Sequence, residues 1–126
     1  MQVLSLLTSS EDKEEFQLTF GAVNDTAIQL TMLIGKYEAQ ALALTLQKMK
    51  PTAPLPLDIL EEVITKCGQT VKEVVIDSLI QDIFTAKIIC VNENKEMDFK
   101  ARPVDATTIA LKFNAPIFIM TDLLKR

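Results

Sequence analysis

Glu38 is the residue of this chain whose position is hardest to explain by packing alone. It lies near the start of a helix predicted over residues 36–49, and a period of 3.6 residues places it on the same face as Leu42, Thr45 and Met49. A carboxylate at this point has two explanations. It either complements the positive end of the helix dipole, worth about 0.3–1 kcal/mol, or it is a functional carboxylate or an ion-pair partner at an interface.

Two other acids also lie near predicted helix starts. Asp58 is close to the start of a helix predicted over residues 57–68, where it can cap the helix or complement its dipole. Asp105 follows Arg102-Pro103, and a proline at the first helical position is typical of a helix start. Capping or the helix dipole therefore explains each acid by itself. A functional role would require the folded chain to bring these acids together with a cation.

The composition excludes several kinds of catalytic site. The chain has no histidine and two cysteines, Cys67 and Cys90. It therefore cannot use a histidine base, a Ser-His-Asp or Cys-His arrangement, or a zinc site with histidine or four cysteine ligands. The two cysteines lie 23 positions apart and form no Cys-x-x-Cys pair, so we expect buried, small apolar residues rather than a redox pair.

The overall charge argues against general electrostatic attraction to nucleic acid. Thirteen Lys and Arg residues against seventeen Asp and Glu residues give a net charge of -4, the wrong sign for binding a polyanion through the whole surface. With no Trp and one Tyr, the chain also has few aromatic platforms for stacking bases, although six Phe remain. Any basic site must therefore be local.

The length and composition predict one soluble globular domain over residues 1–126. At 126 residues with 48% hydrophobic side chains, the chain can bury a core without disulfides or a structural metal. The N-terminal residues lack the basic start of a secretory signal, and no apolar run approaches the roughly 20 residues that cross a bilayer. We therefore expect a cytoplasmic protein that does not enter the membrane.

The first half of the chain predicts strands followed by two helices. Short β-rich runs at 3–7, 16–21 and 27–34 indicate a meander, with the acidic residues 11–15 as a solvated loop. Residues 36–49 are rich in Ala, Leu, Gln and Lys and predict a helix that is buried on more than one side and stopped by Pro51. A proline-rich linker then leads into the second helix.

The second half predicts a sheet, a helix and a last strand. Residues 71–80, 82–91 and 95–101 indicate a three-stranded antiparallel meander, and the last of these alternates apolar with charged residues, so one face is wet. A helix over VDATTIALKF and a buried strand at 116–120 follow. The predicted class is α+β, with three helices and a mostly antiparallel or mixed sheet, in the order strands, helix, helix, three strands, helix, strand.

The apolar first helix and the short strands also predict self-association. Strands this short must cover one another, and a helix with so few polar positions needs more than one neighbour. We expect a homo-oligomer, either a dimer or a higher symmetric assembly.

Four segments resemble the bifunctional nuclease domain family, in the same order and at similar spacing. They are MLIGKYEAQALALTLQKMKP, PLDIL, DIFTAKI and DFKARPVDATTIALKFNAPIFI, and together they extend over nearly the whole chain. The most specific pieces are two short motifs, Gly-x-x-Glu-Ala and Arg-Pro-x-Asp-Ala. Their residues are Gly35, Glu38 and Ala39 in the first and Arg102, Pro103, Asp105 and Ala106 in the second.

This resemblance implies a compact α+β domain that self-associates and cleaves both RNA and DNA. The polar positions that match the family are Glu38, Asp58, Arg102 and Asp105. The chain departs from the family pattern where it reads Ala53-Pro54-Leu55-Pro56-Leu57-Asp58, since the family usually has Arg-Pro-Leu-Thr-His-Asp there, and at Val104, where the family has serine. The expected activity therefore ranges from metal-dependent hydrolysis to weak or lost activity.

If the chain is a nuclease, Glu38, Arg102 and Asp105 are the predicted catalytic residues. Cleavage without histidine would use Glu38 and Asp105 to hold Mg²⁺ or Mn²⁺, and Arg102 to offset the charge of the phosphate. The alternative is a structural ion pair in which Arg102 binds Asp105 or Glu38, within a non-catalytic regulatory or assembly module. Both hypotheses require the three side chains to meet in space.

Overall fold

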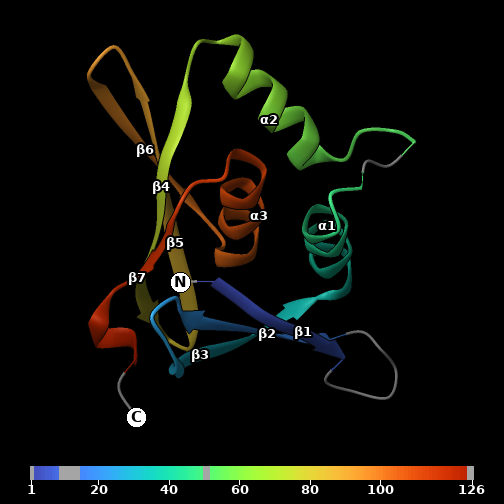
Figure 1. Cartoon of the computed structure of the whole chain (residues 1–126), viewed down its shortest axis with the longest axis vertical. Helices are drawn as coiled ribbons and strands as arrows, with labels where there is room; N and C mark the ends of the chain where they lie inside the picture. Colours follow the sequence, from blue (N-terminus) through green and yellow to red (C-terminus); the bar gives the residue numbers. More distant parts are fainter. Residues whose placement is uncertain (1, 9–14, 50–51, 125–126) are drawn as a thin grey trace.

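The computed structural model describes residues 2–8, 15–49 and 52–124, and this part of the chain has the predicted α+β architecture (Figure 1). The acidic loop predicted at 11–15 lies outside the described residues except for Glu15, the first residue of a strand. The elements in chain order are β1 (Gln2–Thr8), β2 (Glu15–Ala22), β3 (Asp25–Gly35), α1 (Lys36–Leu46), α2 (Pro56–Lys66), β4 (Thr70–Ile80), β5 (Ile83–Asn92), β6 (Lys95–Ala101), α3 (Pro103–Phe113), β7 (Ile117–Ile119) and the 3₁₀ helix η1 (Thr121–Leu124).

The described strands form two sheets, and each contains one of the predicted meanders. The first is antiparallel with the order β1-β2-β3, and the second has the order β6-β5-β4-β7. The second sheet is antiparallel except for β7, which runs parallel to β4, so it is mixed. Each of its two hairpin turns has two residues with positive φ, Gln81-Asp82 and Glu93-Asn94, the backbone that best matches the twist of paired strands.

Helix α3 lies at the centre of the molecule, with the four-stranded sheet on one side and α1 on the other (Figure 1). Arg102 precedes it with an extended backbone, Pro103 occupies its first position, and Asn114 ends it in the left-handed conformation. Seven of its residues are buried, from Pro103 to Ala110 without Asp105. The core around it includes Leu18, Phe20, Leu42, Ile76 and Ile109.

The first helix is shorter and less buried than predicted. α1 ends at Leu46 rather than residue 49, and Lys48 has a positive φ of 56°. Only Ala39 and Leu42 are buried in α1, while Leu46 is 41% exposed and Met49 beyond it 56%. The reason is that α1 packs against α3 with one side, and its last turn extends past the elements that cover it.

Two other local predictions need correction. Cys67, just after α2, is exposed, so only Cys90 is the buried thiol that was predicted. Burial raises the pKa of Cys90, which keeps it protonated. The last strand is shorter than predicted, with Ile117 buried and Phe118 49% exposed, because it lies at a sheet edge.

The described helices do not reach membrane-spanning length. Each α-helix has 11 residues, about 16 Å at the usual rise per residue. No helix in the described ranges is both long and apolar enough to cross a bilayer.

The contact between α1 and α3 gives a stability prediction. Leu42→Ala, at a fully buried position, should lower the free energy of unfolding by about 2–5 kcal/mol because it removes packed atoms and leaves a cavity. The control Leu46→Ala, one turn later and 41% exposed, should cost less than about 1 kcal/mol. Urea unfolding followed by circular dichroism measures both values. Equal losses would show that α1 does not pack as described.

Candidate functional site

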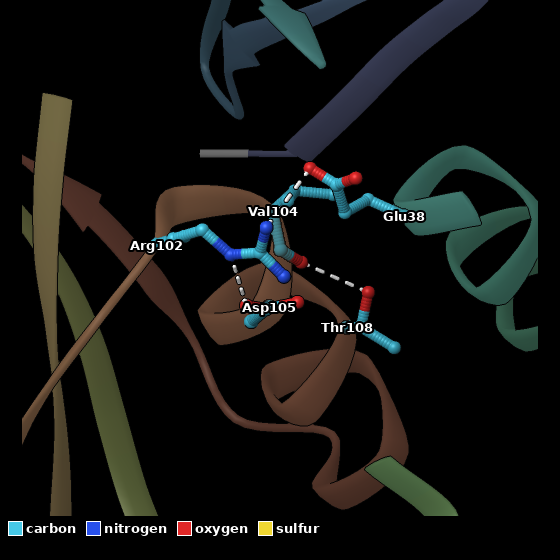
Figure 2. Close-up of polar contacts among 5 residues, drawn as sticks. All are labelled: Glu38, Arg102, Val104, Asp105 and Thr108. Carbon is cyan, nitrogen blue, oxygen red and sulfur yellow. Dashed lines mark hydrogen bonds and ion pairs between the residues drawn. The ribbon is translucent and has the colours of Figure 1, made fainter. Parts of the chain in front are cut away.

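Glu38, Arg102 and Asp105 meet where the N-terminal ends of α1 and α3 come together (Figure 2). Arg102 Nε donates to Asp105 Oδ2 over 2.7 Å, and Arg102 Nη1 donates to Glu38 Oε2 over 3.2 Å. We call these three residues the carboxylate–arginine triad. The convergence on which the sequence hypotheses depended is therefore confirmed, and Arg102 pairs with both acids rather than with one.

Backbone geometry before each helix positions the triad. Arg102 ends the extended run of β6, and Asp105 lies three residues later on the first turn of α3, so the two side chains face each other. On α1, the carboxylate of Glu38 folds back over Gly35. A Cβ added at Gly35 would lie 2.6 Å from Glu38 Oε1, closer than real Cβ contacts. A side chain at position 35 would therefore displace the Glu38 carboxylate from this place.

The triad combines a permanently charged, exposed arginine with two acids that are mostly shielded from solvent. The Arg102 side chain is 64% exposed, whereas those of Glu38 and Asp105 are 23% and 25% exposed. The hydrogen bond to Asp105 raises the pKa of Arg102, and the charges of Asp105 and Glu38 add to this, while partial burial opposes it. Arg102 therefore stays positively charged, and its Nη2 has no hydrogen-bond partner among the described residues.

Two open cavities meet at the triad. The larger, of about 600 Å³, lies between the tip of the β4–β5 hairpin, sheet β1-β2-β3 and the start of α3. Its lining residues are Gln17, Thr31, Met32, Leu33, Ile34, Glu38, Asp82, Ile83, Phe84, Arg102, Pro103 and Val104. The smaller, of about 410 Å³, is lined by residues that include Tyr37, Leu57 and Asp105. Glu38 and Arg102 line both, so the triad forms the wall between them.

The triad as arranged does not form a complete set of ligands for a divalent cation. Mg²⁺ prefers about six oxygen ligands, whereas the two carboxylates here each already bind the guanidinium of Arg102. Within residues 2–8, 15–49 and 52–124, no group of three or more His, Cys, Asp or Glu side chains is placed to hold a metal.

Asp58, the other predicted candidate, belongs to a separate cluster between α2 and α3. Its Oδ2 accepts a hydrogen bond of 2.8 Å from the backbone N–H of Leu55, which confirms the predicted capping role. Its Oδ1 lies 2.5 Å from Nζ of Lys112, whose side chain is 12% exposed and also lies 3.9 Å from Glu61. This cluster joins α2 to α3 and takes no part in the triad.

Most of the cavity wall was missed by sequence reasoning. Thr31, Ile83 and Phe84 come from β3 and β5, which have no motif that marks them as part of a site. Val104, where the family has serine, is buried and lines the larger cavity. Its backbone carbonyl accepts a hydrogen bond from the Thr108 hydroxyl over 2.9 Å (Figure 2). The position is therefore close to the triad, but its side chain is apolar.

The sequence of this chain matches the profile of a known family. The sequence profile of the bifunctional nuclease domain matches residues 20–126, which include every residue of the triad. The chain belongs to the bifunctional nuclease domain family. The resemblance drawn from the two motifs is thereby confirmed.

Two relatives from Mycobacterium tuberculosis, one from strain CDC 1551 / Oshkosh and one from strain H37Rv, are each 36% identical to the chain over 90 residues. Both are uncharacterized proteins. The match extends over 71% of this chain and 53% of each relative, so the chain spans about half the length of these proteins.

The Asp58 cluster gives a second stability prediction. Asp58→Ala should lower the free energy of unfolding by about 1–3 kcal/mol, because it removes a helix cap and leaves the mostly buried Lys112 without its nearest partner. The control Glu62→Ala breaks the Glu62–Lys66 pair on the exposed side of α2 and should leave stability almost unchanged. Chemical unfolding measures both, and an unaffected Asp58→Ala protein would contradict the assigned role.

Proposed function

We propose that this domain binds and hydrolyses phosphodiester bonds of single-stranded RNA or DNA at the carboxylate–arginine triad. The observation that carries the proposal is the state of Arg102. It is 64% exposed, held by two carboxylates, and lines both cavities. An arginine in this state is suited to bind a phosphate, because its planar fork matches two phosphate oxygens. Membership of the bifunctional nuclease domain family supports the same reaction class.

In the proposed hydrolysis, each residue of the triad has its own role. Asp105 fixes the plane of the guanidinium through Nε, which leaves Nη2 to donate to a phosphate oxygen. The charge that develops on the phosphate during attack by water is stabilised by Arg102. Glu38 lies on the other side of the guanidinium, at 3.2 Å, and accepts the proton of the attacking water as general base. Solvent water protonates the leaving oxygen.

The larger cavity supports a single-stranded substrate. Beside Arg102 its wall is mostly apolar, with Leu33, Ile83 and Phe84 among its residues. Such a wall accommodates the face of a nucleobase, and only an unstacked, unpaired base can enter it. With a net charge of -4, the domain lacks the general positive surface that would hold a duplex by its backbones. Binding is therefore proposed to depend on one phosphate and its neighbouring base.

The nuclease assay is to be run with Mg²⁺ and with Mn²⁺. Glu38 and Asp105 are their predicted ligands, but Arg102 binds both carboxylates. A metal-dependent reaction would require Arg102 to move away from at least one of them. Activity with and without each ion, and in the presence of a chelator, separates that route from direct action of Arg102.

A second candidate function is a non-catalytic regulatory or assembly module. It is supported by the residues missing from the family pattern, since Ala53 and Leu57 replace an arginine and a histidine. It is also supported by the ion pairs themselves, because two of the three guanidinium nitrogens are engaged within the domain. This candidate predicts no cleavage under any metal condition.

The activity prediction concerns the triad. Glu38→Gln, Arg102→Met and Asp105→Asn should each lower kcat/KM for a single-stranded oligonucleotide by about a hundredfold or more, because each removes charge stabilisation or proton transfer. Lys66→Met, which breaks an exposed ion pair on α2, is the matched control and should keep full activity. Thermal melting checks that all variants fold.

Two outcomes would decide against the proposed reaction. Cleavage that survives all three triad variants would assign it to another site or to a contaminant. A wild-type protein that cleaves nothing with Mg²⁺, Mn²⁺ or chelator present would favour the non-catalytic module.

A separate prediction tests the base-binding role of the cavity. Leu33→Ala and Ile83→Ala remove exposed apolar side chains from its wall and should raise KM severalfold while kcat changes less than about twofold, because the loss is one of binding rather than of chemistry. Ile80→Ala is the control, since Ile80 is equally exposed and pairs with Ile83 but does not line the cavity. A duplex cleaved as fast as the single strand would contradict this role.

A further inference from the structure

Strand β6 forms an open edge of the four-stranded sheet. Its only described strand neighbour is β5, so one row of backbone N–H and C=O groups faces away from the sheet. All its residues from Lys95 to Lys100 are exposed. An open hollow of about 470 Å³ runs along this edge, lined by Ile89, Glu96, Met97, Asp98 and Phe99. Exposed edges of this kind are templates for pairing with another strand.

The apolar side chains of β6 continue the core face of the sheet. Met97 lies opposite Cys90, and Phe99 opposite Ile88, and residues directly opposite in an antiparallel pair point to the same face. Cys90 and Ile88 are buried, whereas Met97 is 45% and Phe99 50% exposed. Helix α3 packs on β4 and β5 and does not extend over β6. The prediction of one wet face is therefore incomplete, because β6 is exposed on both faces.

The charged residues of β6 alternate with these apolar residues. Glu96, Asp98 and Lys100 point to the opposite, solvated face, where Asp98 lies near Lys87 of β5 and Glu96 near Lys72 of β4. Their signs along the strand are negative, negative and positive. This asymmetric order determines which alignments with a second strand bring opposite charges together.

We infer that β6 pairs antiparallel with β6 of a second copy of this chain, with Phe99 opposite Phe99 of that copy. This alignment places Asp98 opposite Lys100 of the second copy, twice by symmetry, and Met97 opposite Ala101. The two four-stranded sheets join into one, and the apolar stripe of each copy continues into the other. Opposite charges and aromatic residues that lie directly across a strand pair are the stabilising kind of neighbours.

Other alignments bring like charges together. Alignment on Asp98 pairs Glu96 with Lys100 but places Asp98 opposite its own copy. Alignment on Met97 places Glu96 opposite Asp98, and alignment on Lys100 pairs two lysines. A shift by an odd number of residues would put apolar side chains opposite charged ones on one face. A parallel pair in register would set every charge beside its own copy. The charge order of β6 thus fits a second copy in one antiparallel register, which argues for this partner over an unrelated strand.

The test is charge reversal and its rescue. Wild-type protein should sediment with twice the mass of one chain. Asp98→Lys and Lys100→Asp should each weaken the dimer by about tenfold or more, since each replaces two attractive pairs with two repulsive ones. The double variant Asp98→Lys/Lys100→Asp should restore the wild-type dissociation constant. Lys95→Asp is the matched control, because Lys95 lies beyond the paired residues in this register, and it should leave the dimer intact.

Each contrary outcome overturns the inference. A wild-type protein that is monomeric at all concentrations tested has no such interface. An assembly that keeps its mass in both single variants uses another surface. A folded double variant that remains monomeric excludes this register. It would instead fit alignment on Asp98, in which Glu96 then lies opposite the new acid at position 100. Circular dichroism confirms folding, and the result does not depend on nuclease activity.

Discussion

The ion pairs of Arg102 join Asp105, three residues away, and Glu38, which lies 64 residues away in the sequence. They join the N-terminal end of α1 to that of α3, where the helix dipoles favour negative charge and an arginine alone would be unfavourable. Two acids offset that cost and hold the guanidinium in a fixed plane. The same contact brings the two cavities together, so the position of α1 on α3 determines the shape of the site as well as the local charge.

Much of the fold could be predicted because local patterns and tertiary packing agree. Alternation in the strands, turn residues between β4, β5 and β6, and Arg102-Pro103 before α3 each indicate an element that the structure contains. Arg102 and Asp105 lie three residues apart at a helix start, and this spacing favours the contact that the structure contains. The contact with Glu38 was a hypothesis, and no local rule could have established it.

The remaining features depend on which elements cover one another, and this information is spread over the whole chain. Leu46 and Leu42 belong to one helix with similar apolar spacing, yet only Leu42 is buried, because α3 reaches it. Ile83 and Phe84 look like ordinary strand residues and become part of a cavity wall only when the hairpin tip meets the other sheet. Asp58 shows the reverse, since this candidate site residue proved to join α2 to α3 through Lys112.

The closeness of Glu38 to Gly35 ties the acid to the last residue of β3. A side chain at residue 35 would meet Oε1 of Glu38, which is the far end of a flexible side chain, while Arg102 binds the other oxygen. Enlarging residue 35 would therefore shift the Glu38 carboxylate and alter its ion pair with Arg102, whereas the backbone of β3 could stay in place.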